Sequence, residues 1–140
     1  MIVLDTNVLS ELMRAEPNAR VAAWIAQQAG ADLFTTAITE AEIFYGIELL
    51  VKGKRRDSLL AAAEAMFAEE FAGRVLGFGS EAARHFAGVA AHRRAMGKPI
   101  SHADAQIAAI ASAHGAKLAT GDGADFEECG VAVIDPWRTS

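Results

Sequence analysis

The sequence predicts a three-layer α/β fold, in which helices cover both faces of a central, mostly parallel sheet of five strands. Short apolar runs rich in β-branched residues alternate with longer segments whose apolar residues recur at helical spacing. Helices of this length between consecutive strands supply the crossover connections that parallel pairing requires. A chain of 140 residues is long enough to bury one core, so we expect residues 1–140 to form a single domain.

Five short runs are the expected strands. The first is Ile2-Val3-Leu4, which ends abruptly at the polar segment Asp5-Thr6-Asn7. The others cover residues 33–36, 75–78, 117–120 and 131–134. Their shortness and their apolar, β-branched character are typical of strands buried inside a parallel sheet.

Helical spacing fills the segments between the strands. Val8, Leu9 and Leu12 mark a first helix, and a second is expected after Pro17, with Asn18 as its N-cap, as far as Gly30. The remaining helices are expected over residues 39–51, 58–71, 80–96 and 102–115. Strands and helices therefore alternate through most of the chain.

Composition and charge exclude several classes of protein. With 52% hydrophobic residues the chain is not disordered, and no apolar run reaches the ~18 residues of a membrane span. Asp5 and Glu11 stand where a signal peptide would be apolar, and the single cysteine, Cys129, excludes a disulfide framework. We therefore expect a cytoplasmic protein without a membrane partner. The net charge of −5 also argues against metal-free, non-specific binding to nucleic acid.

Four acidic residues are predicted to meet at one edge of the sheet. Asp5 follows the first strand and Asp122 follows the fourth, while Glu42 and Asp104 are expected in the first turns of two helices. Ligands of open parallel sheets collect at the carboxyl ends of the strands, where the following helices begin. The topology therefore places all four carboxylates on a single rim.

Each acid also has a structural explanation. Thr39-x-x-Glu42 has the pattern of a capping box, and Ser101-x-x-Asp104 is a shorter version of it. Asp5 can cap the helix that follows it, and aspartate is favoured in turns such as the glycine-flanked one around Asp122. Considered one at a time, each acid is as well explained by structure as by chemistry.

Considered together, the four acids point to a metal site. Clustered carboxylates repel one another and raise one another's pKa unless a cation lies among them. Carboxylates and water are the ligands that Mg²⁺ and Mn²⁺ prefer, and such a site suits metal-assisted hydrolysis of a phosphodiester. The sequence contains neither a P-loop nor a G-x-G-x-x-G motif, so the competing prediction of nucleotide cradling is not supported.

An ordered set of short motifs resembles the PIN-domain family, specifically toxins of the VapC/FitB type. The first motif is Leu4-Asp5-Thr6-Asn7-Val8-Leu9, and the resemblance extends over essentially the whole chain. The later motifs are Thr39-x-x-Glu42-Ile43-x-x-Gly46, Asp104-x-x-Ile107-Ala108, Thr120-x-Asp122-x-x-Asp125-Phe126 and the closing Val133-Ile134-Asp135-Pro136-Trp137.

The resemblance implies the toxin of a type II toxin–antitoxin pair, acting as an endoribonuclease that needs Mg²⁺ or Mn²⁺. Asp5, Glu42, Asp104 and Asp122 match the family's four acidic positions. Asp5 and Asp104 are thereby implied as direct metal ligands, with Asp122 and Glu42 completing the site. The implied partners are an RNA substrate and a cognate antitoxin, with operator DNA reached only through the antitoxin. A homodimer is also implied.

The fourth motif departs from the family pattern, and the role of a basic run is left open by the sequence. Many relatives carry arginine and then asparagine after the threonine of the fourth motif, where this chain has Gly121 and Asp122. The basic run 52–56 is either an RNA contact or a solvated turn between helices. The resemblance further implies that the helices flanking this run form a groove for an antitoxin segment, although residues such as Phe44, Tyr45, Met66, Phe67 and Phe71 are more often core at this spacing.

Two alternatives to a nuclease follow from the same residues. One is a non-catalytic acidic binding module, whose carboxylates only cap helices and recruit an antitoxin-like or DNA-binding partner. The other is a phosphatase or phosphoacceptor domain on a similar sheet. The second is disfavoured because position 7, two residues after Asp5, is asparagine rather than a second aspartate.

Overall fold

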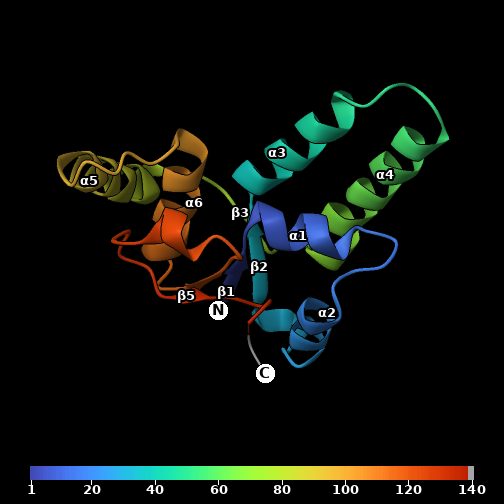
Figure 1. Cartoon of the computed structure of the whole chain (residues 1–140), viewed down its shortest axis with the longest axis horizontal. Coiled ribbons are helices and arrows are strands. Elements are labelled where there is room, and N and C mark those ends of the chain that lie inside the picture. The colour runs from blue at the N-terminus through green and yellow to red at the C-terminus, as the bar shows by residue number, and fades with distance from the viewer. Residues whose placement is uncertain (139–140) are drawn as a thin grey trace.

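Five parallel strands form the centre of the molecule, in the order β3-β2-β1-β4-β5 (Figure 1). The computed structural model describes residues 1–138. The strands are β1 (Ile2–Leu4), β2 (Leu33–Thr36), β3 (Val75–Leu76), β4 (Lys117–Ala119) and β5 (Val133–Ile134). All four neighbouring pairs are parallel, which confirms the predicted α/β class with a sheet that is wholly rather than mostly parallel.

Within residues 1–138, six α-helices surround the sheet, with three short helical turns between them. The α-helices are α1 (Thr6–Leu12), α2 (Ala19–Ala26), α3 (Ala37–Glu48), α4 (Lys54–Ala65), α5 (Ser80–Ala95) and α6 (His102–Ala113). The turns are η1 (Gly30–Asp32), the π-helical η2 (Met66–Glu70) and η3 (Gly123–Phe126). In Figure 1, α5 and α6 lie on one side of the strands, and α1 to α4 lie on the other.

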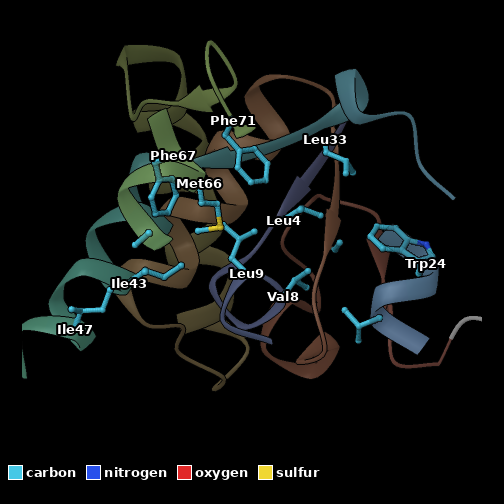
Figure 2. Close-up of a cluster of buried hydrophobic side chains, with 13 residues drawn as sticks. Leu4, Val8, Leu9, Trp24, Leu33, Ile43, Ile47, Met66, Phe67 and Phe71 are labelled. Carbon is cyan, nitrogen blue, oxygen red and sulfur yellow. The ribbon is translucent and has the colours of Figure 1, made fainter. Parts of the chain in front are cut away.

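Alternating side chains of the strands divide the core into two layers. Leu4 and Ala119 belong to the cluster beneath α1 to α4, whereas their neighbours Val3 and Leu118 belong to the cluster beneath α6. Figure 2 shows the first of these clusters, where side chains from β1, α1, α3 and η2 meet. Apolar surface on both faces of the sheet is therefore covered by helices, which is the predicted three-layer arrangement.

The helix after β2 begins earlier than the sequence pattern indicated. The Thr36 hydroxyl accepts a hydrogen bond from the Thr39 amide at 3.1 Å, so the N-cap is Thr36 rather than Thr39. Glu42 consequently lies beyond the first turn, and the capping box predicted for Thr39 and Glu42 is wrong. Two threonines three residues apart offer the same capping chemistry, and the end of β2 at Thr36 decides which one is used.

The long alanine-rich helix also begins earlier than predicted, at Lys54 instead of Ser58. Gly53 is its N-cap, and the Asp57 amide donates to the Gly53 carbonyl at 3.1 Å. Lys54, Arg55 and Arg56 of the basic run therefore lie in the first turn of α4, in keeping with the high helix propensity of lysine and arginine, and only Lys52 lies in the connection between the helices. Arg56 pairs with Glu48 of α3 at 3.0 Å, which links the two helices of this hairpin.

Aromatic residues of this hairpin divide between core and surface. Met66, Phe67 and Phe71 are buried, so the implied groove cannot be formed by them, and Tyr45 is 66% exposed.

The second helix ends at Ala26 rather than Gly30, although Asn18 caps it as predicted. Among residues 1–138, no helix has the combined length and apolar character needed to cross a membrane.

Candidate metal centre at the carboxyl edge of the sheet

The strand order creates a topological switch point between β1 and β4. The chain builds outward from β1 through β2 to β3, and then returns to the other side of β1 with β4. Crevices at such switch points, outside the carboxyl ends of the strands, are where open α/β sheets bind their ligands. Asp5 follows β1 and Asp122 lies three residues beyond β4, so these two acids flank the switch point.

Asp5 is the most buried of the four predicted acids. It is 3% exposed and is the N-cap of α1, where Oδ1 accepts a hydrogen bond from the Val8 amide at 3.0 Å. Burial, together with the smaller effect of the charges of Asp122 and Asp104, raises the pKa of this carboxyl to about 6, against the lowering effect of hydrogen bonds from Thr120 and Val8. Among residues 1–138, no basic side chain forms an ion pair with this carboxylate.

Asp104 lies in the first turn of α6, as predicted. Ser101 is the N-cap of this helix, and its hydroxyl accepts from the Asp104 amide at 3.2 Å. Burial raises the pKa of the Asp104 carboxyl, and the charges of Asp125, Glu42 and Asp122 add to the rise. Acids from α3, α6 and the segment after β4 thus act on one another electrostatically.

The first turn of α1 contacts the other two acids. The Thr6 hydroxyl donates to Glu42 Oε1 at 2.6 Å, and the Asn7 side-chain amide donates to Asp122 Oδ2. Three consecutive residues, Asp5-Thr6-Asn7, therefore supply one acid and hold two more. The motif was noted in the sequence, but the role of Asn7 was missed because its partner lies 115 residues away in the chain.

Asp125 is a fifth carboxylate close to the same edge. It lies in η3, and its charge is the largest electrostatic contribution to the raised pKa of Asp104. The sequence contained a signal for it, since it belongs to the fourth motif, but it was not counted among the candidate ligands. His102, the first residue of α6, packs its ring against that of Phe86, with 5.6 Å between the ring centroids.

The donor set fits a hard divalent cation. None of Asp5, Glu42, Asp104 and Asp122 forms an ion pair with a basic residue in the described part of the chain. Within residues 1–138 no three His, Cys, Asp or Glu side chains form a ready-made group that could hold a metal ion. Glu42 accepts a hydrogen bond from Thr6, and Asp122 accepts one from Asn7. A set made only of carboxylates suits Mg²⁺ or Mn²⁺ with water-mediated contacts. It does not suit Zn²⁺, which typically takes nitrogen and sulfur ligands.

Gly121, at the position where the resemblance led us to expect arginine, packs directly against a tryptophan. A Cβ atom at this position would lie 2.8 Å from Cζ3 and 2.9 Å from Cε3 of Trp137. Trp137 itself is held by a hydrogen bond from its amide to Asp135 Oδ1 at 2.9 Å. An arginine at position 121 is therefore incompatible with the indole where it lies, which gives the departure from the family pattern a steric reason.

Gly121→Ala should lower the free energy of unfolding by about 1 to 3 kcal/mol, because the added methyl group must displace a rigid ring. Gly123→Ala is the matched control, since a Cβ there meets only Val133 Cγ1 at an ordinary 3.9 Å. Urea denaturation of both variants measures the difference, and Trp137→Leu should make the Gly121→Ala change less costly. Equal effects at positions 121 and 123 would contradict the steric explanation.

The fold and its acidic edge define an α/β protein with candidate metal ligands at a topological switch point, and comparisons with known proteins agree with this class. The family model for the PIN domain matches residues 2–131. The chain is 45% identical to VapC ribonuclease Y4jK of Sinorhizobium fredii and 41% identical to toxin FitB of Neisseria gonorrhoeae, in each case over 99% of both chains. The crystal structure of FitAcB from Neisseria gonorrhoeae superposes with a TM-score of 0.92 at 40% identity, covering 99% of this chain and 100% of that one.

This chain belongs to the PIN domain family. The family that the ordered motifs indicated is thereby confirmed. Several solved structures with the same fold are toxin–antitoxin complexes, among them DNA-bound VapBC from Salmonella typhimurium, with a TM-score of 0.82 at 25% identity, 96% coverage of this chain and 97% of that one.

Proposed function

We propose that this protein is the toxin of a type II toxin–antitoxin pair and hydrolyses RNA phosphodiester bonds with the help of Mg²⁺ or Mn²⁺. The observation that carries the proposal is the group Asp5, Glu42, Asp104 and Asp122, which comes from four separate segments and has no cationic partner among residues 1–138. The names of the relatives support the same activity, since one is a VapC ribonuclease and another is a toxin.

Asp5 and Asp104 are the proposed direct ligands of the cation, and Asp122 and Glu42 would bind it directly or through water. A bound Mg²⁺ or Mn²⁺ would polarise the scissile phosphodiester and lower the pKa of a nearby water. The remaining contributions come from the chain. Thr6 orients the Glu42 carboxylate at 2.6 Å, and Asn7 orients Asp122. Thr120 donates to Asp5 and also accepts from the Asp122 amide at 3.0 Å, so one hydroxyl joins two of the acids.

The proposed antitoxin site is a groove that leads from the acidic edge along α1, α3 and α4. It has a volume of about 980 Å³ and begins at Thr6 and Glu42. Its walls are mainly apolar and include Ile43, Gly46, Ile47 and Leu59. An apolar peptide segment fits these walls, and a cationic side chain of that segment could reach the acids. Relatives solved as FitAcB and VapBC complexes support such a partner.

Further parts of the proposal concern assembly and location. The chain would act as a single domain in the cytoplasm and as a homodimer. Operator DNA would be contacted only through the antitoxin, and the solved structure of FitAB with a DNA fragment supports this arrangement.

Purified protein should cleave a structured RNA such as total transfer RNA in Mg²⁺ or Mn²⁺, and should lose this activity in EDTA. Re-addition of either cation should restore cleavage, and the cognate antitoxin that the proposal requires should inhibit it. Gel electrophoresis of the RNA provides the measurement. Undiminished cleavage in EDTA would exclude a metal-dependent mechanism. Absence of cleavage with any cation would favour the non-catalytic binding module instead.

A further inference from the structure

Arg93 is a buried arginine whose partners are main-chain carbonyls rather than a carboxylate. It lies in the last turn of α5 and is 6% exposed. Its Nε donates to the Lys98 carbonyl at 2.8 Å, and its Nη1 donates to the carbonyls of Asp125 at 2.7 Å and Glu127 at 3.0 Å. Nη1 also lies 3.5 Å from the Cys129 thiol. A guanidinium held in this way is fixed in both position and orientation, because it bonds in a planar fork.

These three carbonyls belong to the two segments that carry acids of the candidate metal centre. Lys98 lies in the short connection that leads from α5 to Ser101, the N-cap of the helix bearing Asp104. Its main chain is held twice, because its amide also donates to the Arg93 carbonyl at 2.9 Å. Asp125 and Glu127 lie in and directly after η3, the turn that Asp122 precedes. One side chain therefore joins the entrance of α6 to the turn after β4.

A purely structural role would not require a charge at this place. Burying a guanidinium costs desolvation energy, and packed apolar residues of similar size often stabilise a fold at least as well. What an apolar residue cannot do is fix the mutual position of two loops through three directed hydrogen bonds. Acidic ligands on separate loops need such fixing, because ligand geometry and the groups that orient the ligands set metal affinity.

We propose that Arg93 is a positioning residue of the candidate metal centre, which sets the distance between Asp104 and Asp122 by tying their two segments together. The inference rests on the proposed metal-dependent function and deepens it. Arg93 itself does not reach the cation or the substrate. Loss of its hydrogen bonds separates the segments and weakens cation binding without removing any ligand.

Arg74 provides a matched control within the same chain. Its guanidinium also donates to three main-chain carbonyls, those of Gly30, Leu33 and Glu70. The carbonyls of Gly30 and Leu33 lie in η1 and at the beginning of β2, and that of Glu70 lies at the end of η2, while Arg74 itself directly precedes β3. This is the edge of the sheet opposite to the acids. Changing either arginine to lysine or glutamine thus removes similar hydrogen bonds. At position 74 these bonds lie far from the proposed centre, and at position 93 they lie beside it.

The test measures Mn²⁺ binding to the full chain by isothermal titration calorimetry, with thermal unfolding in EDTA as a separate readout of stability. Arg93→Lys and Arg93→Gln should weaken Mn²⁺ binding at least about tenfold. Arg74→Lys and Arg74→Gln should change it by less than about twofold, although both pairs lower the melting temperature. RNA cleavage by Arg93→Lys should recover at saturating Mn²⁺, because its ligands remain in place.

The outcomes separate this inference from the proposed function. If the unsubstituted chain binds no Mn²⁺, the metal centre and the role of Arg93 are both wrong. If it binds Mn²⁺ and Arg93→Lys binds equally well, only the role of Arg93 is wrong. Equal weakening by the changes at positions 74 and 93 would also overturn it, since the effect would then follow general stability. Should Arg93→Gln not fold, the comparison of Arg93→Lys with Arg74→Lys decides the matter.

Discussion

Asp104→Asn should reduce RNA cleavage at least about a hundredfold while leaving the fold intact. The carboxylate is a proposed ligand, and asparagine offers only one neutral oxygen where two charged ones stood. Folding does not depend on this charge, because the N-cap bond at Ser101 uses the main-chain amide of residue 104 and survives the change. The measurement is the initial rate of cleavage of a structured RNA at several Mg²⁺ concentrations, with circular dichroism to verify the fold.

Asp57→Asn is the matched control for this experiment. Asp57 also lies in the first turn of a helix, in this case α4, and it is exposed. Any loss caused by weaker interaction with the helix dipole should therefore appear in both variants, and this effect is worth about 0.3 to 1 kcal/mol at the surface. Cleavage by Asp104→Asn at more than about a tenth of the unsubstituted rate would contradict the assignment of Asp104 as a ligand.

Asp5→Asn should make the metal-free protein more stable at neutral pH, by about 2 to 3 kcal/mol. The pKa of Asp5 rises from the ordinary 3.8 to about 6 on folding, so the folded state binds this proton more tightly than the unfolded state does. Below pH 3.8 the carboxyl is protonated in both states and costs nothing. Between about pH 4 and 6 the unfolded chain releases the proton first, and stability falls as the pH rises. Above pH 6 the full penalty remains, and asparagine removes it while still capping α1.

Urea denaturation in EDTA at several pH values measures this effect. The difference between the two proteins should be large at pH 7.5 and should vanish near pH 4. Asn18→Asp is the matched control, because it makes the reverse exchange at the exposed N-cap of α2, where no comparable pH dependence is expected. With Mn²⁺ added, the unsubstituted protein should gain stability and Asp5→Asn should not. A variant that is less stable than the unsubstituted protein at pH 7.5 in EDTA would show that Asp5 is only a cap.

The fold was predictable because its signals are local. The strands are short runs rich in apolar or β-branched residues, and most helices repeat their apolar residues at a period that differs from that of a strand. The helix α4 was instead predictable from the high helix propensity of its alanines. Edges of elements were less predictable, as Thr36 and Thr39 illustrate, since both carry the same capping group. The position where β2 ends determines which threonine becomes the N-cap, and that position is fixed by the pairing of β2 with β1 and β3.

The grouping of the four acids at one edge followed from topology alone, because parallel strands end on the same side of a sheet. Their hydrogen-bond partners did not follow. Asn7 meets Asp122 across 115 residues, and Gly121 meets Trp137 only because the segment after β5 returns to the switch point. Arg93 gave no signal at all, since its partners are carbonyls, which every residue has. Contacts of this kind depend on packing and leave no local pattern.

The contact between Asn7 and Asp122 has a consequence for biosynthesis. The two residues are 115 positions apart, so the acidic edge cannot be complete until nearly the whole chain has been made. At about 5 to 20 residues per second, that interval lasts several seconds or more. During it, β1 lacks its β4 neighbour, and only Asp5 and Glu42 of the four acids are present for most of the time. A growing or prematurely ended polypeptide would therefore be inert, and the proposed nuclease activity would arise only at the end of the chain's own translation.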